Sequence, residues 1–232
     1  MPLPRIDEAF VIEFIRTIIN GDNSQVAQLL SAHPRLIHAG LHTEFFSEEI
    51  MHQLYTGDTG LHVAAAAFNV EIAATLISKG ADIHAKNRRG AEALHYASDS
   101  GPMKSTWNTE AQKDVINFLI QSGANLNAVD KCGASPLHRA VRTRSTEAVG
   151  ALLAGGAEVR IKNHNGSTPL HLAVQNTGKG GTGAPESKAH QAKIIELLLE
   201  SGADPEDQDF KGRTVKQWIR EKSIKSLFPG GD

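Results

Sequence analysis

One short pattern recurs along the chain and limits what it can fold into. In four of its copies a glycine is followed four residues later by a Leu-His pair, and a fifth glycine opens a related stretch near the C-terminus. The separations between successive glycines are 33, 43, 33 and 46 residues, so two equal 33 and two exceed it by 10 and 13. A fixed period of this length is typical of repeat proteins, whose units bury their apolar residues only against neighbouring units. The glycines are Gly57, Gly90, Gly133, Gly166 and Gly212.

The residue types in each copy predict two helices joined by a turn, and residues 130–162 form the uninterrupted copy. In the fourth copy Gly166 permits a positive φ in a tight turn. Thr168 is suited to cap a helix, and Pro169 is suited to its first position. Leu170 then points into the stack, and Gly202 ends the second helix in a left-handed conformation. Each local preference supports the same helix-turn-helix unit.

The fourth copy reads Thr-Pro-Leu-His-x-Ala, and this stretch resembles the signature of the ankyrin repeat family. The resemblance implies an all-α solenoid of stacked helix-turn-helix units with β-turn fingers. It also implies that protein partners bind along the fingers and the concave helix face. The chain departs from the signature at Thr59-Gly60, at Glu92-Ala93 and at Lys216, which stands where a core leucine is expected.

The repeats suggest a division of the chain into segments. We expect an N-terminal capping helix pair at 1–39, an inserted finger segment at 40–56, repeats at 57–86, 87–129, 130–162 and 163–209, and a C-terminal cap and tail at 210–232. Insertions near 101–113 and 177–190 fall between the two helices of a repeat. In the finger segment, Ser47-Glu48-Glu49 predicts a short helix. In the C-terminal cap we expect Trp218, Ile219 and Leu227 to provide the packing.

Composition excludes several functional classes. The net charge of -2 gives no general attraction to nucleic acid or to an anionic membrane. No apolar run approaches the roughly 18 to 20 residues of a membrane-spanning helix, and the N-terminus is a poor signal peptide. Cys132 has no partner for a disulfide or for a Cys-rich zinc site. The lone cysteine favours the reducing cytoplasm, although delivery into another cell stays open. The sequence leaves the oligomeric state open, and a monomer is assumed.

No set of residues suggests catalysis, a cofactor or a metal. The four motif histidines recur with the repeat, so they form a ladder, and the resemblance gives them hydrogen bonds near the turn. His33, His38, His42 and His52 cluster, but without the spacing of zinc ligands. The glycine-rich segment 178–183 lacks the order of a phosphate loop and is interpreted as a flexible insertion. We therefore expect no enzyme activity, cofactor or metal. The motif histidines are His62, His95, His138 and His171.

The charge pattern allows two interpretations. Basic residues gather in the middle fingers, whereas the C-terminal finger and the inserted segment are acidic. The pattern is either an incidental solvated surface or a basic centre that steers an acidic protein partner. Nucleic-acid or other polyanion binding through the basic repeats is the alternative function, and it would require several phosphate contacts. Phe45 and Phe46 form either the small core of the insertion or an apolar anchor. The candidate partner-binding residues are Arg88, Arg89, Asp99, Lys131, Arg142, Arg144, His164, Gln175, Phe45 and Phe46.

Overall fold

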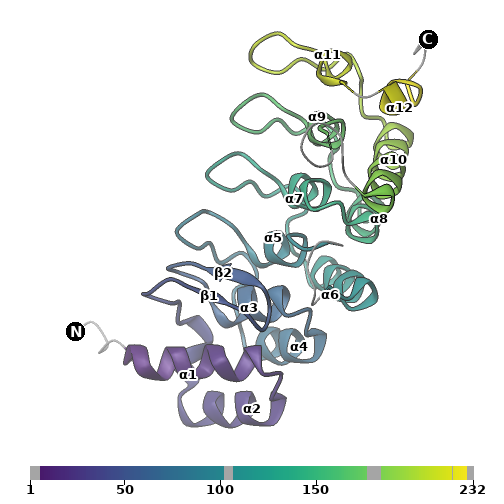
Figure 1. Cartoon of the computed structure of the whole chain (residues 1–232). Coiled ribbons are helices and arrows are strands. Elements are labelled where there is room, and N and C mark those ends of the chain that lie inside the picture. The colour runs from purple at the N-terminus through teal and green to yellow at the C-terminus, as the bar shows by residue number, and fades with distance from the viewer. Residues whose placement is uncertain (1–5, 102–106, 177–183, 221, 229–232) are drawn as a thin grey trace. The chain divides into compact units, whose positions relative to one another are not determined.

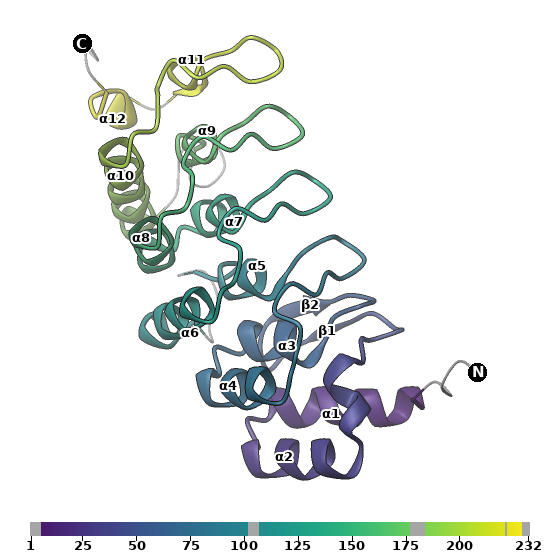
Figure 2. The same cartoon turned by 180° about the vertical axis from the view of Figure 1, so that it is seen from behind.

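The computed structural model describes residues 6–101, 107–176, 184–220 and 222–228. The chain forms two compact units, and each is described by itself. Unit 1 comprises 1–97 and 110–125, and unit 2 comprises 98–109 and 126–232. Figures 1 and 2 show that each repeat places a short inner helix beside its finger loop and a second, outer helix behind it.

The elements of unit 1 are α1 (Glu8–Ile19), α2 (Asn23–Ala32), the 3₁₀ helix η1 (Pro34–His38), β1 (Phe45–Ser47), β2 (His52–Leu54), α3 (Gly60–Ala66), α4 (Val70–Ser78), α5 (Ala93–Ala97) and α6 (Thr109–Gln121). Those of unit 2 are α7 (Pro136–Arg142), α8 (Thr146–Ala154), α9 (Pro169–Ala173), α10 (Pro185–Glu200), α11 (Val215–Trp218) and α12 (Lys222–Lys225).

Unit 1 begins with the helix pair α1 and α2, and each helix starts at an aspartate. The Asp7 side chain accepts a hydrogen bond from the backbone of Ala9, and Asp22 does the same for Gln25. The apolar face of α1 lies against α3, and this contact explains the departure at Thr59-Gly60. A Cβ at Gly60 would come within 2.8 Å of the Phe14 ring. Glycine at the start of α3 therefore lets the capping helix approach closely.

The inserted finger segment forms a β-hairpin. Strands β1 and β2 are antiparallel, with Phe45 opposite Leu54 and Ser47 opposite His52. The short helix predicted from Ser47 is therefore wrong. The Ser47 hydroxyl donates to the Glu49 carboxylate over 2.8 Å, and the turn between the strands contains Met51 at a φ of 49°. Alternate residues face the core, which is the period of a strand.

In the uninterrupted repeats the two helices are joined by a tight turn. In unit 2, Ser135 caps α7 and Ser145 caps α8, while Arg144 adopts a φ of 62° between the helices. In unit 1, Phe68 takes the same place between α3 and α4 with a φ of 55°. In both cases the turn therefore holds a non-glycine residue in the left-handed region.

In the interrupted repeats the predicted insertions contribute to the outer helices. Residues 102–106 and 177–183 lie outside the described residues. Helix α10 begins at Pro185 and runs for 16 residues, against 9 for α8, so 185–190 are helical. Helix α6 likewise begins at Thr109 and runs for 13 residues. Part of each insertion therefore lengthens the second helix.

The C-terminal cap buries other side chains more fully than the three predicted, although the predicted Trp218 ring does pack 5.4 Å from that of His171. Val215, Ile224 and Phe228 are buried, whereas Trp218, Ile219 and Leu227 are only partly buried. Lys216 stands where the other repeats have a core leucine, but it faces water and pairs with Glu206 over 2.7 Å. A charged residue is therefore tolerated at this position of the cap.

The described residues are mostly helical, and the all-α fold class is confirmed. Within them, no helix is both long and apolar enough to cross a membrane.

Candidate functional site

An aspartate or asparagine side chain holds each finger loop between Asn87 and Gly212. In the finger of the third repeat, the Asp130 carboxylate accepts from the backbone of Cys132 over 2.8 Å and of Ala134 over 3.0 Å. Such side chains can replace a backbone acceptor in a turn. Sequence analysis did not identify this role, although the signal was available, because the residue always precedes the turn glycine by three positions. The four are Asn87, Asp130, Asn163 and Asp209.

Within each unit, neighbouring fingers are joined by a backbone hydrogen bond near the tip. In unit 1 the Arg88 amide donates to the Thr56 carbonyl over 2.8 Å. In unit 2 the His164 amide donates to Cys132 over 2.9 Å, and the Phe210 amide donates to Asn165 over 3.1 Å. The finger tips are therefore fixed next to one another, and their side chains form a preorganised surface in each unit.

The motif histidines are structural groups. The Ser135 amide donates to Nδ1 of His138 over 3.2 Å, so Nε2 carries the proton and donates to the carbonyl of Ser167 over 3.0 Å. This bond ties one repeat to the next finger. Burial lowers the pKa of His138 and outweighs the hydrogen bond to Ser167, which acts to raise it. His62 and His171 make the equivalent contacts in their repeats.

Three of the predicted partner-binding residues come together on one side of the hairpin in unit 1, namely Phe46, Arg88 and Arg89. Phe46 is opposite Gln53 and is 51% exposed, whereas Phe45 points to the other side and is half-buried. The register places Glu44 and Tyr55 on the same side as Phe46. Arg88 pairs with Glu44 over 2.7 Å, and the Arg89 guanidinium lies 5.1 Å from the centre of the Tyr55 ring. We call this surface the hairpin face, and it consists of Glu44, Phe46, Gln53, Tyr55, Arg88 and Arg89.

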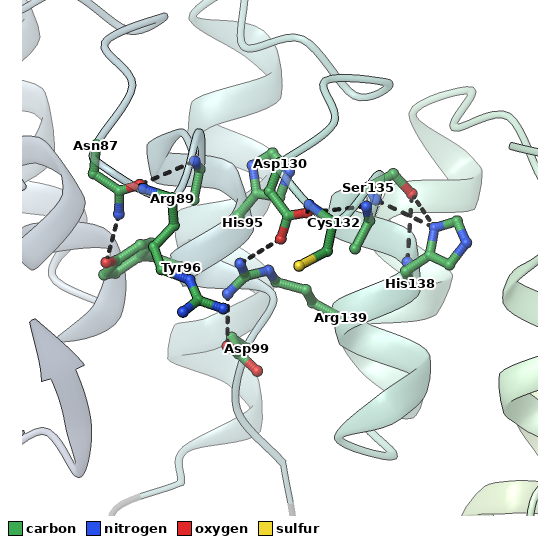
Figure 3. A network of polar contacts seen from close by, with 12 residues as sticks. Asn87, Arg89, His95, Tyr96, Asp99, Asp130, Cys132, Ser135, His138 and Arg139 are labelled. Atoms are coloured by element: carbon green, nitrogen blue, oxygen red, sulfur yellow. Dashed lines mark hydrogen bonds and ion pairs between the residues drawn. The ribbon is translucent and has the colours of Figure 1, made fainter. Parts of the chain in front are cut away.

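A buried network fixes the finger that bears Arg88 and Arg89 to the hairpin. Asp58 is fully buried, and its carboxylate accepts from the Tyr55 amide, the Asn87 side chain and the Tyr96 hydroxyl over 2.7, 2.8 and 2.7 Å. Figure 3 shows Asn87 pointing toward Tyr96, with Arg89 on the same finger. The carboxylate thus has three donors, which a buried charge requires. The cationic side chains therefore project from a rigid base.

In unit 2, Asp99 and Arg142 belong to an ion-pair cluster. The Arg139 guanidinium lies 2.8 Å from both Asp99 and Asp130 (Figure 3). Arg142 lies 2.9 Å from Asp99. Burial opposes charge on Arg139, but the two aspartates raise its pKa. Burial also acts to raise the pKa of Asp130, yet the hydrogen bonds from Arg139, Ala134 and Cys132 lower it. Sequence analysis missed Arg139, the centre of this cluster.

Arg144 also has its donors engaged within unit 2. Its guanidinium donates to the carbonyl oxygens of Ala173 over 3.1 Å and of Gln175 over 2.8 Å, at the C-terminal end of α9. Burial lowers the pKa of Arg144 to about 10, so the group is still charged at neutral pH. Cations are favourable at this end of a helix. The side chains of Lys131, His164 and Gln175 are exposed.

Most of the remaining basic side chains of the middle repeats are paired inside the chain. Lys86 lies 3.6 Å from the buried carboxylate of Glu92, which occupies the cap position of α5. Arg160 pairs with Asp207 over 2.6 Å and also contacts Asp204, so the acidic C-terminal finger neutralises it. The basic stretch and the acidic stretch therefore meet within unit 2.

The histidines near the inserted segment take separate positions. The His33 ring packs 4.8 Å from that of Phe10, and His52 stacks on Tyr96 at 4.5 Å. His38 and His42 line a cavity beside α1. Over the residues that the structure describes, no three acidic, cysteine or histidine side chains are arranged to hold a metal ion.

Comparison with known proteins agrees with this architecture. Two family models match, ankyrin repeats (3 copies) over residues 103–209 and ankyrin repeats (many copies) over residues 61–104. Viral relatives include ankyrin repeat protein B18 of vaccinia virus (strain Ankara) and of variola virus, and ankyrin repeat protein B19 of vaccinia virus (strain Western Reserve). Each is 38% identical over 74 residues, a stretch that covers 29% of this chain and 13% of the relative. Ankyrin repeats generally are protein–protein interaction modules. The chain belongs to the ankyrin repeat family.

Proposed function

We propose that this chain is a non-catalytic protein-binding module whose partner contacts the hairpin face of unit 1. The observation that supports this most directly is Phe46, a large apolar side chain left 51% exposed beside the stacked pair of Arg89 and Tyr55. Aromatic residues and arginine are enriched among the residues that dominate binding energy at protein interfaces. Because the finger is held by Asp58, little conformational entropy is lost when a partner binds.

The charges of this face favour a partner with an acidic group near an apolar one. Glu44 pairs with Arg88, whereas Arg89 stacks on the neutral ring of Tyr55 and has no carboxylate partner among the described residues, so its charge is available. The exposed side chains of Lys131 and His164 on the fingers of unit 2 offer further contacts. We leave Asp99, Arg142 and Arg144 out of the proposed contact surface, because other residues of the chain already occupy their charged groups.

The pairing of the basic residues also explains our preference for a protein over a polyanion. A nucleic-acid site needs several cations free to contact phosphates. Arg139, Arg144 and Arg160 each contact acceptors of the chain itself.

A cytoplasmic location is part of the proposal, and the free, exposed thiol of Cys132 supports it, since a reducing compartment preserves such a group. Within this proposal the module serves as a scaffold, an inhibitor or an adaptor.

The test uses the partner captured by the whole chain from its native cell, then purified. We expect Phe46→Ala to weaken the affinity about tenfold or more without changing the unfolding midpoint. Arg88→Glu with Arg89→Glu should slow association, most strongly at low salt. Phe210→Ala is the matched control, because Phe210 is an exposed phenylalanine, 71% accessible, on a finger of unit 2. Unchanged affinity and association rate in the hairpin variants would refute the proposal.

Phe45→Ala separates the two interpretations of the aromatic pair. Phe45 is half-buried and faces away from the hairpin face, opposite Leu54. We expect this variant to lower the stability of the hairpin and to affect binding only through that loss. A folded Phe45→Ala protein that no longer bound, while Phe46→Ala bound normally, would move the contact surface to the other side of the hairpin.

A further inference from the structure

Unit 1 contains a cavity of about 570 Å³ next to the first turn of α1, and none of its described lining residues belongs to the hairpin face. Its volume is within the range of small-ligand sites, roughly 300 to 1,000 Å³. One part of the wall is aliphatic and comes from α1 and the residues before it. The other part comes from η1 and the following loop, and contains three groups that are cationic or can become so. The lining residues are Ile6, Val11, Arg35, His38, Ala39, Gly40 and His42.

Arg35 is one of the arginines that have no carboxylate partner among the residues that the structure describes. Arg88, Arg139 and Arg160 are all paired with carboxylates. Arg35 and His38 have no ion pair or side-chain hydrogen bond to any residue that the structure describes. No acidic residue is among the described residues that line the cavity. The cavity therefore presents an uncompensated guanidinium beside an apolar surface.

Glu8, the nearby acid, is occupied by the loop itself. Its Oε1 accepts from the amides of His42 over 3.1 Å and Thr43 over 3.3 Å, and from the Thr43 hydroxyl over 3.2 Å. Its Oε2 lies 3.8 Å from Nε2 of His42. Glu8 therefore anchors the loop that forms one wall and does not pair with Arg35. The cavity keeps its shape because this wall is tied to α1.

We propose that this cavity binds a carboxylate carried on a branched aliphatic group. The guanidinium of Arg35 can receive the carboxylate with two parallel hydrogen bonds, and His38 can donate another. Ile6 and Val11 provide the surface for the aliphatic part. The same chemistry occurs in a free branched-chain acid and in an apolar C-terminal residue of a peptide. The site is separate from the hairpin face and does not depend on the proposed function.

Calorimetric titration of the whole chain tests this site with four probes. The first two are 4-methylpentanoate and its neutral isostere 4-methylpentanamide. The others are the peptide Gly-Ser-Gly-Leu with a free C-terminus and with an amidated one. We expect saturable binding of at least one carboxylate probe, and binding at least about tenfold weaker of its amide. Binding of the free acid alone identifies a small-molecule site, and binding of the peptide acid identifies a C-terminus receptor.

Substitutions place the binding in the cavity. Arg35→Gln removes the charge of an exposed side chain and should weaken the carboxylate probe about tenfold or more. Arg220→Gln removes another exposed arginine, in unit 2, and should leave the affinity unchanged. Phe46→Ala, which tests the hairpin face, should also leave it unchanged. The proposal is overturned if neither carboxylate binds saturably, if amide and acid bind equally, or if folded Arg35→Gln protein binds like the wild type.

Discussion

The side-chain amide of Gln191, on outer helix α10, donates hydrogen bonds of 2.7 Å to the carbonyl oxygens of both Ala173 and Gln175 and so ends inner helix α9. In unit 1 the Gln112 amide does the same for the Ala97 carbonyl over 2.9 Å. Both glutamines are fully buried, and both are in the repeats that contain insertions. In uninterrupted repeats a backbone amide reaches the equivalent carbonyl, as Ser145 does for Ala140 over 3.1 Å. A buried glutamine therefore replaces the tight turn that each insertion removes.

This replacement predicts that each glutamine contributes to stability, and Gln112 more than Gln191. In Gln112→Ala the buried Ala97 carbonyl loses its side-chain donor, which costs about 1 to 3 kcal/mol of unfolding free energy. Gln191→Ala should cost less, because Arg144 still donates to the carbonyls of Ala173 and Gln175. Urea denaturation followed by circular dichroism measures the loss. Gln121→Ala is the control, because Gln121 is an exposed residue of the same helix as Gln112. Losses no larger than that of the control would contradict the role assigned to the two glutamines.

The two arginines that contact Asp99 should differ greatly in their contributions. The Arg139 side chain is 13% exposed and bridges Asp99 and Asp130, whereas that of Arg142 is 63% exposed. Arg139→Met leaves the buried Asp130 carboxylate without its cation and leaves Asp99 paired with the exposed Arg142, and it should cost about 3 to 5 kcal/mol. Arg142→Met removes a solvent-exposed pair and should cost about 1 kcal/mol or less. Thermal and urea unfolding of the two variants, compared side by side, provide the measurement. Similar losses would show that Arg139 is no more important than a surface arginine.

The sequence predicts the repeats well because their signals are local. Thr168 and Pro169 determine where α9 begins, and Gly202 determines where α10 ends, without reference to neighbouring repeats. Arg144 shows the limit of this reasoning. Its basic side chain and its place near the turn suggested a partner contact, but its role depends on carbonyls 29 and 31 residues away.

In the candidate site, too, the sequence identifies individual residues but not the contacts that depend on distant parts of the chain. The sequence singled out Phe46, Arg88 and Arg89 individually, but their arrangement on one face depends on the register of a hairpin that was expected to be a helix. Burial likewise decides which charges are available. Arg139 was not considered because nothing local distinguishes it from an exposed arginine on a helix.

The stability of the repeats should fall in acid in two separate steps. Burial lowers the pKa of His138 and His171 below the ordinary value of 6.5. The unfolded chain therefore binds more protons below about pH 6.5, and the unfolding free energy decreases as the pH falls below that value. The lowered pKa of Asp130, held down by its hydrogen bonds against the effect of burial, contributes stability that is lost only below its ordinary value of 3.8. Urea unfolding at pH 7.5, 6.5 and 5.5 isolates the histidine step.

A substitution can assign the first step to a particular histidine. Gln217 accepts from the Thr214 amide over 3.0 Å in the C-terminal cap, where the other repeats have histidine. His138→Gln should therefore keep the cap of α7 while removing one titrating group, and the pH dependence should become shallower. His164→Gln alters an exposed histidine on the same unit and serves as the matched control. If His138→Gln retained the full pH dependence, the acid step would have another origin.

Two turn glycines of unit 2 separate the need for a positive φ from the need for space beside the next finger. Gly166 meets both needs, and Gly212 meets only the first. Gly166 and Gly212 have φ values of 76° and 73°, so alanine is strained at both, by roughly 1 to 2 kcal/mol. A Cβ at Gly166 would lie 2.3 Å from the Phe210 amide nitrogen of the next finger, whereas a Cβ at Gly212 meets no atom within 4 Å. Gly166→Ala should therefore also break the hydrogen bond from Phe210 to Asn165, at a further cost of about 1 kcal/mol. It should also speed hydrogen exchange at the Phe210 amide, which Gly212→Ala leaves protected. Equal losses of stability and equal exchange in the two variants would show that neighbouring fingers do not require the glycine for their close approach.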